Sequence, residues 1–349
     1  MPAIYPYILL VTFFSGDIGL FDSDKILRMN ESAYNGVAVP LVKAYDTKSL
    51  KGTDFIAAAK GIKEISTKNV WPWVFFNRFY GYKNGNLSHS ILAKADYFRK
   101  IRGLDIYDET GALGDFIEIW RMALKMSRHL NSPGIFADLE AYNNYSIYEM
   151  PYLVDEMKRS PEEIEGRLKA LGARLSDLAA EECPGCTIWF PFTGLECLGR
   201  NNREGGKRQL KTVTQIVVGM LERAREKKTS IVIVSGGLDS LGYCYKSSED
   251  LMDKIAKRRN DFSHLRNRFP NLDLGGTIAP WHDRESRNGW MARGKCKQSS
   301  LKGINDFKPL VKHLLNSYRY VWVYAASAAG YNPYDISIAR IYDELFPSR

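Results

Sequence analysis

Short apolar runs alternate with longer amphipathic segments along the 349-residue chain. The short runs are rich in β-branched and aromatic residues and are bounded by turn residues, a pattern typical of buried strands. Eight such runs predict strands at residues 4–14, 36–42, 70–76, 134–138, 187–192, 230–235, 276–280 and 319–325. Because longer segments separate them, neighbouring strands have to pair in parallel through crossover connections.

Apolar residues spaced three and four apart predict helices between these strands, most clearly at residues 168–178, 210–224 and 304–315. A shorter helix is expected around residues 91–102. The helix before the fifth strand has a full start signal, since Ser160 is a good N-cap, Pro161 suits the first turn and Glu163 completes a capping box.

Eight strand and helix units close naturally into a (β/α)8 barrel, and we expect residues 1–349 to form one α/β domain of this kind. The alternative is a doubly wound open sheet. Both folds place their sites beyond the carboxyl ends of the strands. Long loops after the third strand, residues 81–114, and after the seventh, residues 281–300, are expected to border that site.

Composition is that of an ordinary globular protein, with 45% hydrophobic and 26% charged residues. The net charge of +9 is spread along helical segments with acids interleaved, which indicates solvated helix faces rather than a nucleic-acid surface. The apolar run at residues 8–14 has no basic leader and reads as a core strand, and no run is long enough to span a membrane. Compartment, whether cytoplasmic or secreted after signal removal, and oligomeric state stay open.

The five cysteines include one C-x-x-C pair, Cys183 and Cys186. A zinc site would need a second pair or nearby histidines, and a redox motif would follow a strand. This pair precedes a predicted strand, so a structural role is the simpler interpretation, and no metal site is expected.

The stretch PGIFADLEAYNNY, residues 133–145, carries the clearest candidate chemistry. Asp138 and Glu140 close the fourth strand at i and i+2, so both side chains point to one face. Paired carboxylates suit glycosidic bond cleavage, in which one carboxyl protonates the leaving oxygen and another supports the anomeric carbon. We expect Glu140 to be the acid, because an ionised Asp138 beside it would raise the pKa of Glu140 by repulsion.

Other strand ends supply a ring of carboxylates and aromatic side chains. Asp239, Glu196 and Asp283 each follow a predicted strand and are candidates for the second carboxylate, while a surface or substrate-binding role is open for each. Arg78 could hold an anionic sugar substituent or tie loops together. The predicted substrate-binding residues are Tyr45, Arg78, Tyr142, Tyr243, Trp281, His282, Asp283 and Tyr324. Trp71, Trp73, Trp120, Trp189 and Trp322 lie within elements and are expected in the core.

The segment GIFADLEAY resembles the strand-4 signature of TIM-barrel glycoside hydrolases, especially family 18 chitinases, which end this strand in Asp-x-Glu. The resemblance implies a carbohydrate substrate and Glu140 as the acid. No cofactor is expected, because the chain has no G-x-G-x-x-G motif, no Walker lysine loop and no three-cysteine cluster. The chain departs from the chitinase pattern at Pro133 and Phe136, where two earlier aspartates are expected, so a substrate-assisted mechanism is not implied.

Two alternatives stay open. SIVIVSGGLDS, at residues 230–240, resembles the PP-loop of ATP-pyrophosphatases, in which backbone amides cradle pyrophosphate. The following LGYCYKSS lacks the small-residue helix expected there, and much of the chain precedes the loop. The other alternative is a barrel that binds a glycan without catalysis, because barrels host many functions.

Overall fold

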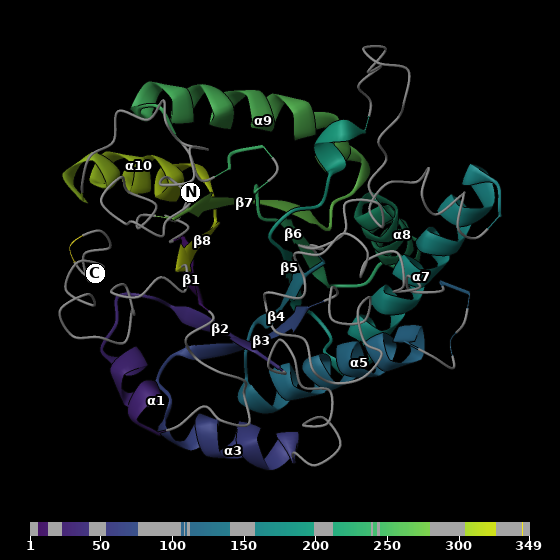
Figure 1. Cartoon of the computed structure of the whole chain (residues 1–349), viewed down its shortest axis with the longest axis horizontal. Helices are drawn as coiled ribbons and strands as arrows, with labels where there is room; N and C mark the ends of the chain where they lie inside the picture. Colours follow the sequence, from purple (N-terminus) through teal and green to yellow (C-terminus); the bar gives the residue numbers. More distant parts are fainter. Residues whose placement is uncertain are drawn as a thin grey trace, which may run out of the picture.

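Eight parallel strands form a closed ring in the computed structural model, in the order of the sequence from β1 to β8 (Figure 1). Pairing of β8 with β1 closes the ring. The predicted (β/α)8 barrel is therefore confirmed, and the open-sheet alternative is wrong. The structure describes residues 6–12, 23–41, 54–75, 106–107, 109, 112–139, 158–198, 212–238, 240–242, 245–279, 304–325 and 344.

Each predicted strand is present. The strands are β1 (Tyr7–Thr12), β2 (Gly36–Pro40), β3 (Asn69–Phe75), β4 (Gly134–Asp138), β5 (Thr187–Phe190), β6 (Val232–Ser235), β7 (Leu272–Ile278) and β8 (Tyr320–Ala325). The bounds of β4 agree with the prediction at both ends. The seventh strand begins earlier than predicted, because Asp273 and two glycines interrupt its apolar pattern.

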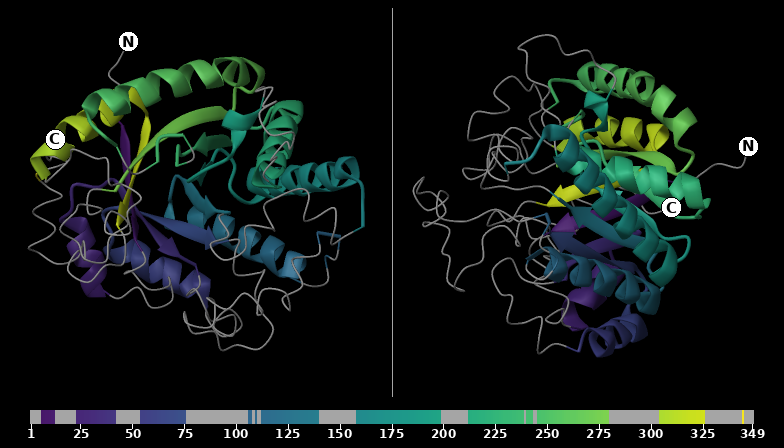
Figure 2. Two further views of the ribbon diagram at one scale, coloured as in Figure 1. Left: turned by 45° about the horizontal axis from the view of Figure 1, so that its top comes forward. Right: turned by 90° about the vertical axis from the view of Figure 1, so that its right-hand side faces the viewer.

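The helices surround the strands on the outside of the ring (Figures 1 and 2). They are α1 (Ser23–Asn30), α3 (Phe55–Ile65), α5 (Ala112–Leu130), α7 (Pro161–Glu182), α8 (Thr212–Lys227), α9 (Ser248–Arg268) and α10 (Ile304–Ser317), with a short 3-10 turn, η5 (Leu195–Cys197), after β5. The predicted helix at 91–102 lies outside the described residues, as do nearly all of the loop at 81–114 and the whole loop at 281–300. None of the described helices is long and apolar enough to cross a membrane.

The start of α7 follows the sequence signal. The amide of Glu163 donates to the Ser160 hydroxyl over 3.2 Å, and the Ser160 amide donates to the Glu163 carboxylate over 2.9 Å. Pro161 is the first helical residue. The predicted capping box is confirmed, and it satisfies two amides that have no partner within the helix.

Helices α7 and α8 approach each other closely through two glycines. A Cβ atom on Gly172 would lie 1.9 Å from the carbonyl oxygen of Ile216, and one on Gly219 would lie 2.1 Å from that of Lys169. The two backbones are therefore in direct contact, and no larger residue fits at either position without moving a helix.

Side chains alternate between the two faces of the barrel wall. Outward residues pack under the helices, whereas inward residues fill the barrel: Leu9, Val11, Ala38, Trp71, Trp73, Phe136, Trp189, Val234, Tyr320 and Trp322. The tryptophans expected in the core are all buried, with Trp120 alone of them in the outer layer. The interior is thus a packed aromatic core rather than a pore. A site at the carboxyl-terminal end of the strands therefore has to lie above this core.

Candidate active site

Asp138 closes β4 at the carboxyl-terminal rim of the barrel. Asp138 is only 3% exposed. Phe136, two residues earlier, belongs to the cluster that fills the barrel, while Ala137 and Leu139 pack in the outer layer. Strand alternation therefore turns Asp138 toward the barrel axis. Glu140, its predicted catalytic partner, lies outside the described residues.

Tyr324 occupies the corresponding level of β8. It is half-buried, and its ring lies 6.3 Å from that of Trp322, two residues earlier on the same face. The ring of Trp322 in turn lies 5.6 Å from that of Phe136 on β4. Asp138 and Tyr324 thus each stand one interior layer above the same aromatic contact, on opposite walls of the rim.

Aromatic rings form the floor beneath this level. Phe136 also lies 5.6 Å from Trp73 and 6.3 Å from Trp189, and the Trp322 indole donates to the carbonyl oxygen of Gly236 over 3.0 Å. This floor keeps water from reaching the rim through the barrel. The side of Asp138 that faces the floor is therefore desolvated, and electrostatic interactions of its carboxylate are stronger than in water.

Glu196, from the turn after β5, lies in a different environment. It is 9% exposed, and its Oε1 accepts a 2.9 Å hydrogen bond from the Ser240 hydroxyl. The Arg258 Nε lies 3.5 Å from the same oxygen. These contacts direct Glu196 toward the loop after β6 and toward α9, rather than toward Asp138.

Arg258 is a buried contact of Glu196 that sequence reasoning missed. The side chain is fully buried and donates over 2.5 Å to the carbonyl oxygen of Gly275, and over 2.7 Å to that of Ser235. In the sequence it lies in a basic run that reads as exposed. The signal was helical spacing, since Arg258 falls between Ile255 and Phe262 on the buried stripe of α9.

The SGGLDS segment begins at the last residue of β6 and leads into the loop that follows, where the amides of Gly236 and Leu238 already have backbone partners. The Gly236 amide donates to Phe190 O over 2.7 Å, and the Leu238 amide donates to Pro191 O over 2.9 Å. A PP-loop needs such amides for phosphate. The geometry therefore argues against the ATP-pyrophosphatase alternative and assigns the loop a fixed place beside β5.

Three of the predicted site residues lie in the described part of the chain: Asp138, Glu196 and Tyr324. Asp138 and Tyr324 share the rim, whereas Glu196 lies toward the helix layer. The other predicted site residues lie outside the described residues: Glu140, Asp239, Tyr45, Arg78, Tyr142, Tyr243, Trp281, His282 and Asp283. Among the described residues, no group of three or more His, Cys, Asp or Glu side chains could hold a metal ion.

The C-x-x-C pair lies at the opposite end of the barrel, immediately before β5, with both thiols free and buried. The Cys183 sulfur lies 3.8 Å from the Ser127 hydroxyl. A hydrogen bond from Cys186 lowers the pKa of Cys183 to about 7, and the same bond together with burial raises the pKa of Cys186. Because it precedes β5, the pair lies at the end of the barrel away from the rim that holds Asp138.

No protein-family model matches the chain, and none of the curated proteins matches its sequence. Its fold is similar to that of several solved structures at low identity. Endo-glycoceramidase II from Rhodococcus sp. is 11% identical, with 93% of this chain and 74% of that chain covered and a TM-score of 0.49. The 3-keto-D-glucoside 4-epimerase of E. coli is 12% identical, with 97% and 98% covered and a TM-score of 0.47.

The endo-β-mannanase/endo-β-glucanase of Prevotella bryantii is 10% identical, with 99% of this chain and 50% of that chain covered and a TM-score of 0.48. These proteins are sugar-processing enzymes by name, and they include both hydrolases and an epimerase. Likeness at this level carries no argument about the reaction of this chain, which has to come from its own residues.

Proposed function

We propose that the chain is a glycosidase that hydrolyses or transfers a glycosidic bond in an oligo- or polysaccharide, with Glu140 as general acid/base. The observation that supports it is the position of Asp138: buried, at the end of β4, and turned toward the barrel axis above an aromatic floor. Glu140 follows two residues later. The proposal requires the extended backbone of β4 to continue to Glu140, so that both carboxyl groups share one direction.

In this mechanism Glu140 protonates the leaving oxygen, and Asp138 orients Glu140 and keeps it protonated by like-charge repulsion. A second carboxylate then acts as nucleophile or as base toward water. We favour Asp239, because hydrogen bonds fix the residues on both sides of it. The Leu238 amide donates to Pro191 O, and the Ser240 hydroxyl donates to Glu196.

Glu196 and Asp283 remain candidates for the second carboxylate. The contacts of Glu196 with Ser240 and Arg258 support a positioning role for it instead. A separation of about 5 to 5.5 Å between the two catalytic carboxyl groups would produce retention, and about 6.5 to 9.5 Å inversion.

The substrate would lie on the rim between the strand ends. Tyr324 supplies a half-buried aromatic wall opposite Asp138, suited to the apolar face of a sugar ring. Arg78 would accept a carboxylate or sulfate on the sugar through bidentate hydrogen bonds. We propose Tyr45, Arg78, Tyr142, Tyr243, Trp281, His282 and Asp283 as its remaining contacts.

Turnover of a panel of neutral and anionic polysaccharides and aryl glycosides tests the proposal. We expect Glu140→Gln to abolish activity without changing the unfolding midpoint, because the amide keeps the shape and cannot donate a proton. Glu181→Gln is the matched control, since Glu181 is exposed at the far end of α7.

Full activity in Glu140→Gln would refute the assignment. Binding of glycans without cleavage of any of them would instead support the non-catalytic barrel. Stabilisation by ATP that is lost in Ser235→Ala would revive the PP-loop alternative, which the engaged amides of Gly236 and Leu238 argue against.

A further inference from the structure

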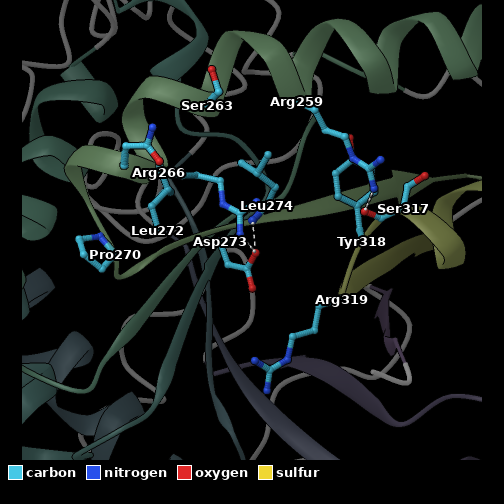
Figure 3. A pocket seen from close by; sticks show the side chains of 11 residues that line it. Arg259, Ser263, Arg266, Pro270, Leu272, Asp273, Leu274, Ser317, Tyr318 and Arg319 are labelled. Atoms are coloured by element: carbon cyan, nitrogen blue, oxygen red, sulfur yellow. Dashed lines mark hydrogen bonds and ion pairs between the residues drawn. The ribbon is translucent and has the colours of Figure 1, made fainter. Parts of the chain in front are cut away.

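A hollow of about 820 Å³ opens at the amino-terminal end of the strands, opposite the rim that holds Asp138 (Figure 3). The second half of α9, the start of β7 and the turn between α10 and β8 form its walls. Its volume is in the range of small-molecule sites, roughly 300 to 1,000 Å³. The proposed glycosidase chemistry makes no use of it.

Three arginines line this hollow, two from one wall and one from another. Arg259 and Arg266 come from α9, and Arg319 comes from the residue before β8. Asp273 is the one carboxylate in the lining, which leaves a formal charge of +2 on the lining. A concave surface with excess guanidinium groups concentrates anions, because field lines converge in a low-dielectric hollow.

The three arginines differ in how far their charge is already compensated. Arg266 has Asp273 within 3.9 Å and lies in the last turn of α9, where a cation also offsets the helix dipole. Among the described residues, no carboxylate lies within ion-pair distance of Arg259 or Arg319. These two guanidinium groups are therefore the ones available to a ligand.

Both groups are also held in place. Arg259 donates over 2.5 Å to the carbonyl oxygen of Ser317, and its guanidinium lies 5.9 Å from the ring of Tyr318. Arg319 lies 5.3 Å from the ring of Tyr320. A guanidinium has five N–H donors, so Arg259 keeps most of its donors for a ligand, and its anchoring lowers the entropy cost of binding.

We propose that this hollow binds a small, multiply charged anion of the phosphate class, with Arg259 and Arg319 as its main ligands. Arg259 from α9 and Arg319 from the turn before β8 offer two guanidinium forks to a molecule with more than one anionic group, and Arg266 adds charge from the α9 wall. An organic or inorganic di- or triphosphate has the required charge and fits the volume. The site is independent of the glycosidase proposal, because no residue is shared.

Inorganic pyrophosphate is the probe, titrated calorimetrically into the full chain at about 0.15 M salt, where unspecific surface binding is screened. We expect saturable binding of one equivalent and a rise in the unfolding temperature. Arg259→Gln and Arg319→Gln should each weaken binding about tenfold or more, since each removes charge-assisted hydrogen bonds.

Arg268→Gln is the matched control, because Arg268 is exposed on the same helix but pairs with Glu222 outside the hollow, at 2.8 Å. It should bind as the wild type does. An absence of saturable pyrophosphate binding would overturn the proposal. So would equal losses in Arg268→Gln and Arg259→Gln, because that pattern reports net charge rather than a site.

Discussion

The aromatic rings of Phe136 on β4 and Trp322 on β8 lie 5.6 Å apart, and they join opposite walls of the barrel directly beneath the rim. Their planes are inclined by 57°, a tilted arrangement that favours ring attraction. Asp138 and Tyr324 follow these two residues by one interior position each. The contact therefore supports both residues of the candidate site from below.

Replacing Phe136 by alanine tests this role of the floor. We expect Phe136→Ala to lower the free energy of unfolding by about 3 to 5 kcal/mol, because it leaves a cavity among buried rings. Turnover per folded molecule should also fall, because Asp138 loses its support. Denaturant unfolding and steady-state kinetics measure the two effects.

Phe269→Ala is the control for that experiment, since Phe269 is equally buried but packs in the outer layer, directly after α9 and away from the rim. It should be destabilised by a similar amount and keep its turnover per folded molecule. If both variants lose turnover alike, the floor has no special connection to the site.

Arg258 and Glu196 form the second relationship with a measurable consequence. Arg258→Met removes a buried cation and leaves Glu196 without it, so we expect a loss of about 3 to 5 kcal/mol in the free energy of unfolding. Glu196→Gln in the Arg258→Met background should recover part of that loss, since the stranded negative charge disappears. A double-mutant cycle by urea unfolding gives the coupling.

Lys257→Met is the neighbouring control, because Lys257 is exposed and its pair with Asp261 is a surface ion pair at 2.6 Å. We expect a change within about 0.5 kcal/mol. Additive losses for Arg258→Met and Glu196→Gln would contradict the coupling. Unchanged turnover in Glu196→Gln would exclude Glu196 as the second catalytic carboxylate.

Much of the fold could be predicted because its signals are local. Short apolar runs located every strand, apolar spacings of three and four located the three clearest helices, and the bounds of β4 agreed at both ends. The start of β7 was missed because Asp273, Gly275 and Gly276 weaken the local strand pattern. Pairing with β6 and β8 nevertheless holds these residues in a strand. Tertiary pairing outweighs propensity there.

The candidate site was predictable only where it depends on strand alternation. The direction of Asp138 follows from the spacing of two within β4. The Arg258 network could not be predicted, because its partner Glu196 is 62 residues away and Ser240 is 44 residues from Glu196. A basic run such as Lys257 to Arg259 looks solvated until the helix face that buries its middle residue is known.

The glycines of α7 provide a matched pair for stability. A Cβ on Gly172 would lie 1.9 Å from Ile216 O on α8, whereas a Cβ on Gly166 meets nothing within 4 Å. We expect Gly166→Ala to stabilise the protein by roughly 0.5 to 1 kcal/mol through helix propensity. Gly172→Ala should destabilise it by about 1 to 3 kcal/mol, because α7 and α8 have to separate.

Thermal and urea unfolding of the two variants test this prediction. The change in the free energy of unfolding should be positive for Gly166→Ala and negative for Gly172→Ala. Stabilisation by Gly172→Ala would mean that the two helices separate at little cost. Their close contact would then not be a determinant of the fold.

The thiols of Cys183 and Cys186 give stability a dependence on pH. The hydrogen bond from Cys186 lowers the pKa of Cys183 to about 7, from an ordinary value of 9.0. Between these two values the folded chain holds a thiolate while the unfolded chain still binds the proton. Stability should therefore rise from pH 7 to pH 9, and this contribution is lost as the pH falls through 7.

Above pH 9 the sign reverses, because the raised pKa of Cys186 keeps its proton in the folded chain while the unfolded chain releases it. Urea unfolding of the wild type and of Cys183→Ala across pH 6 to 10 isolates the effect as a difference between two curves. Cys186→Ala should shift the ultraviolet titration of the Cys183 thiolate upward, since the donor is gone. Parallel stability curves for wild type and Cys183→Ala would show that no thiolate forms at neutral pH, and that the pair serves packing alone.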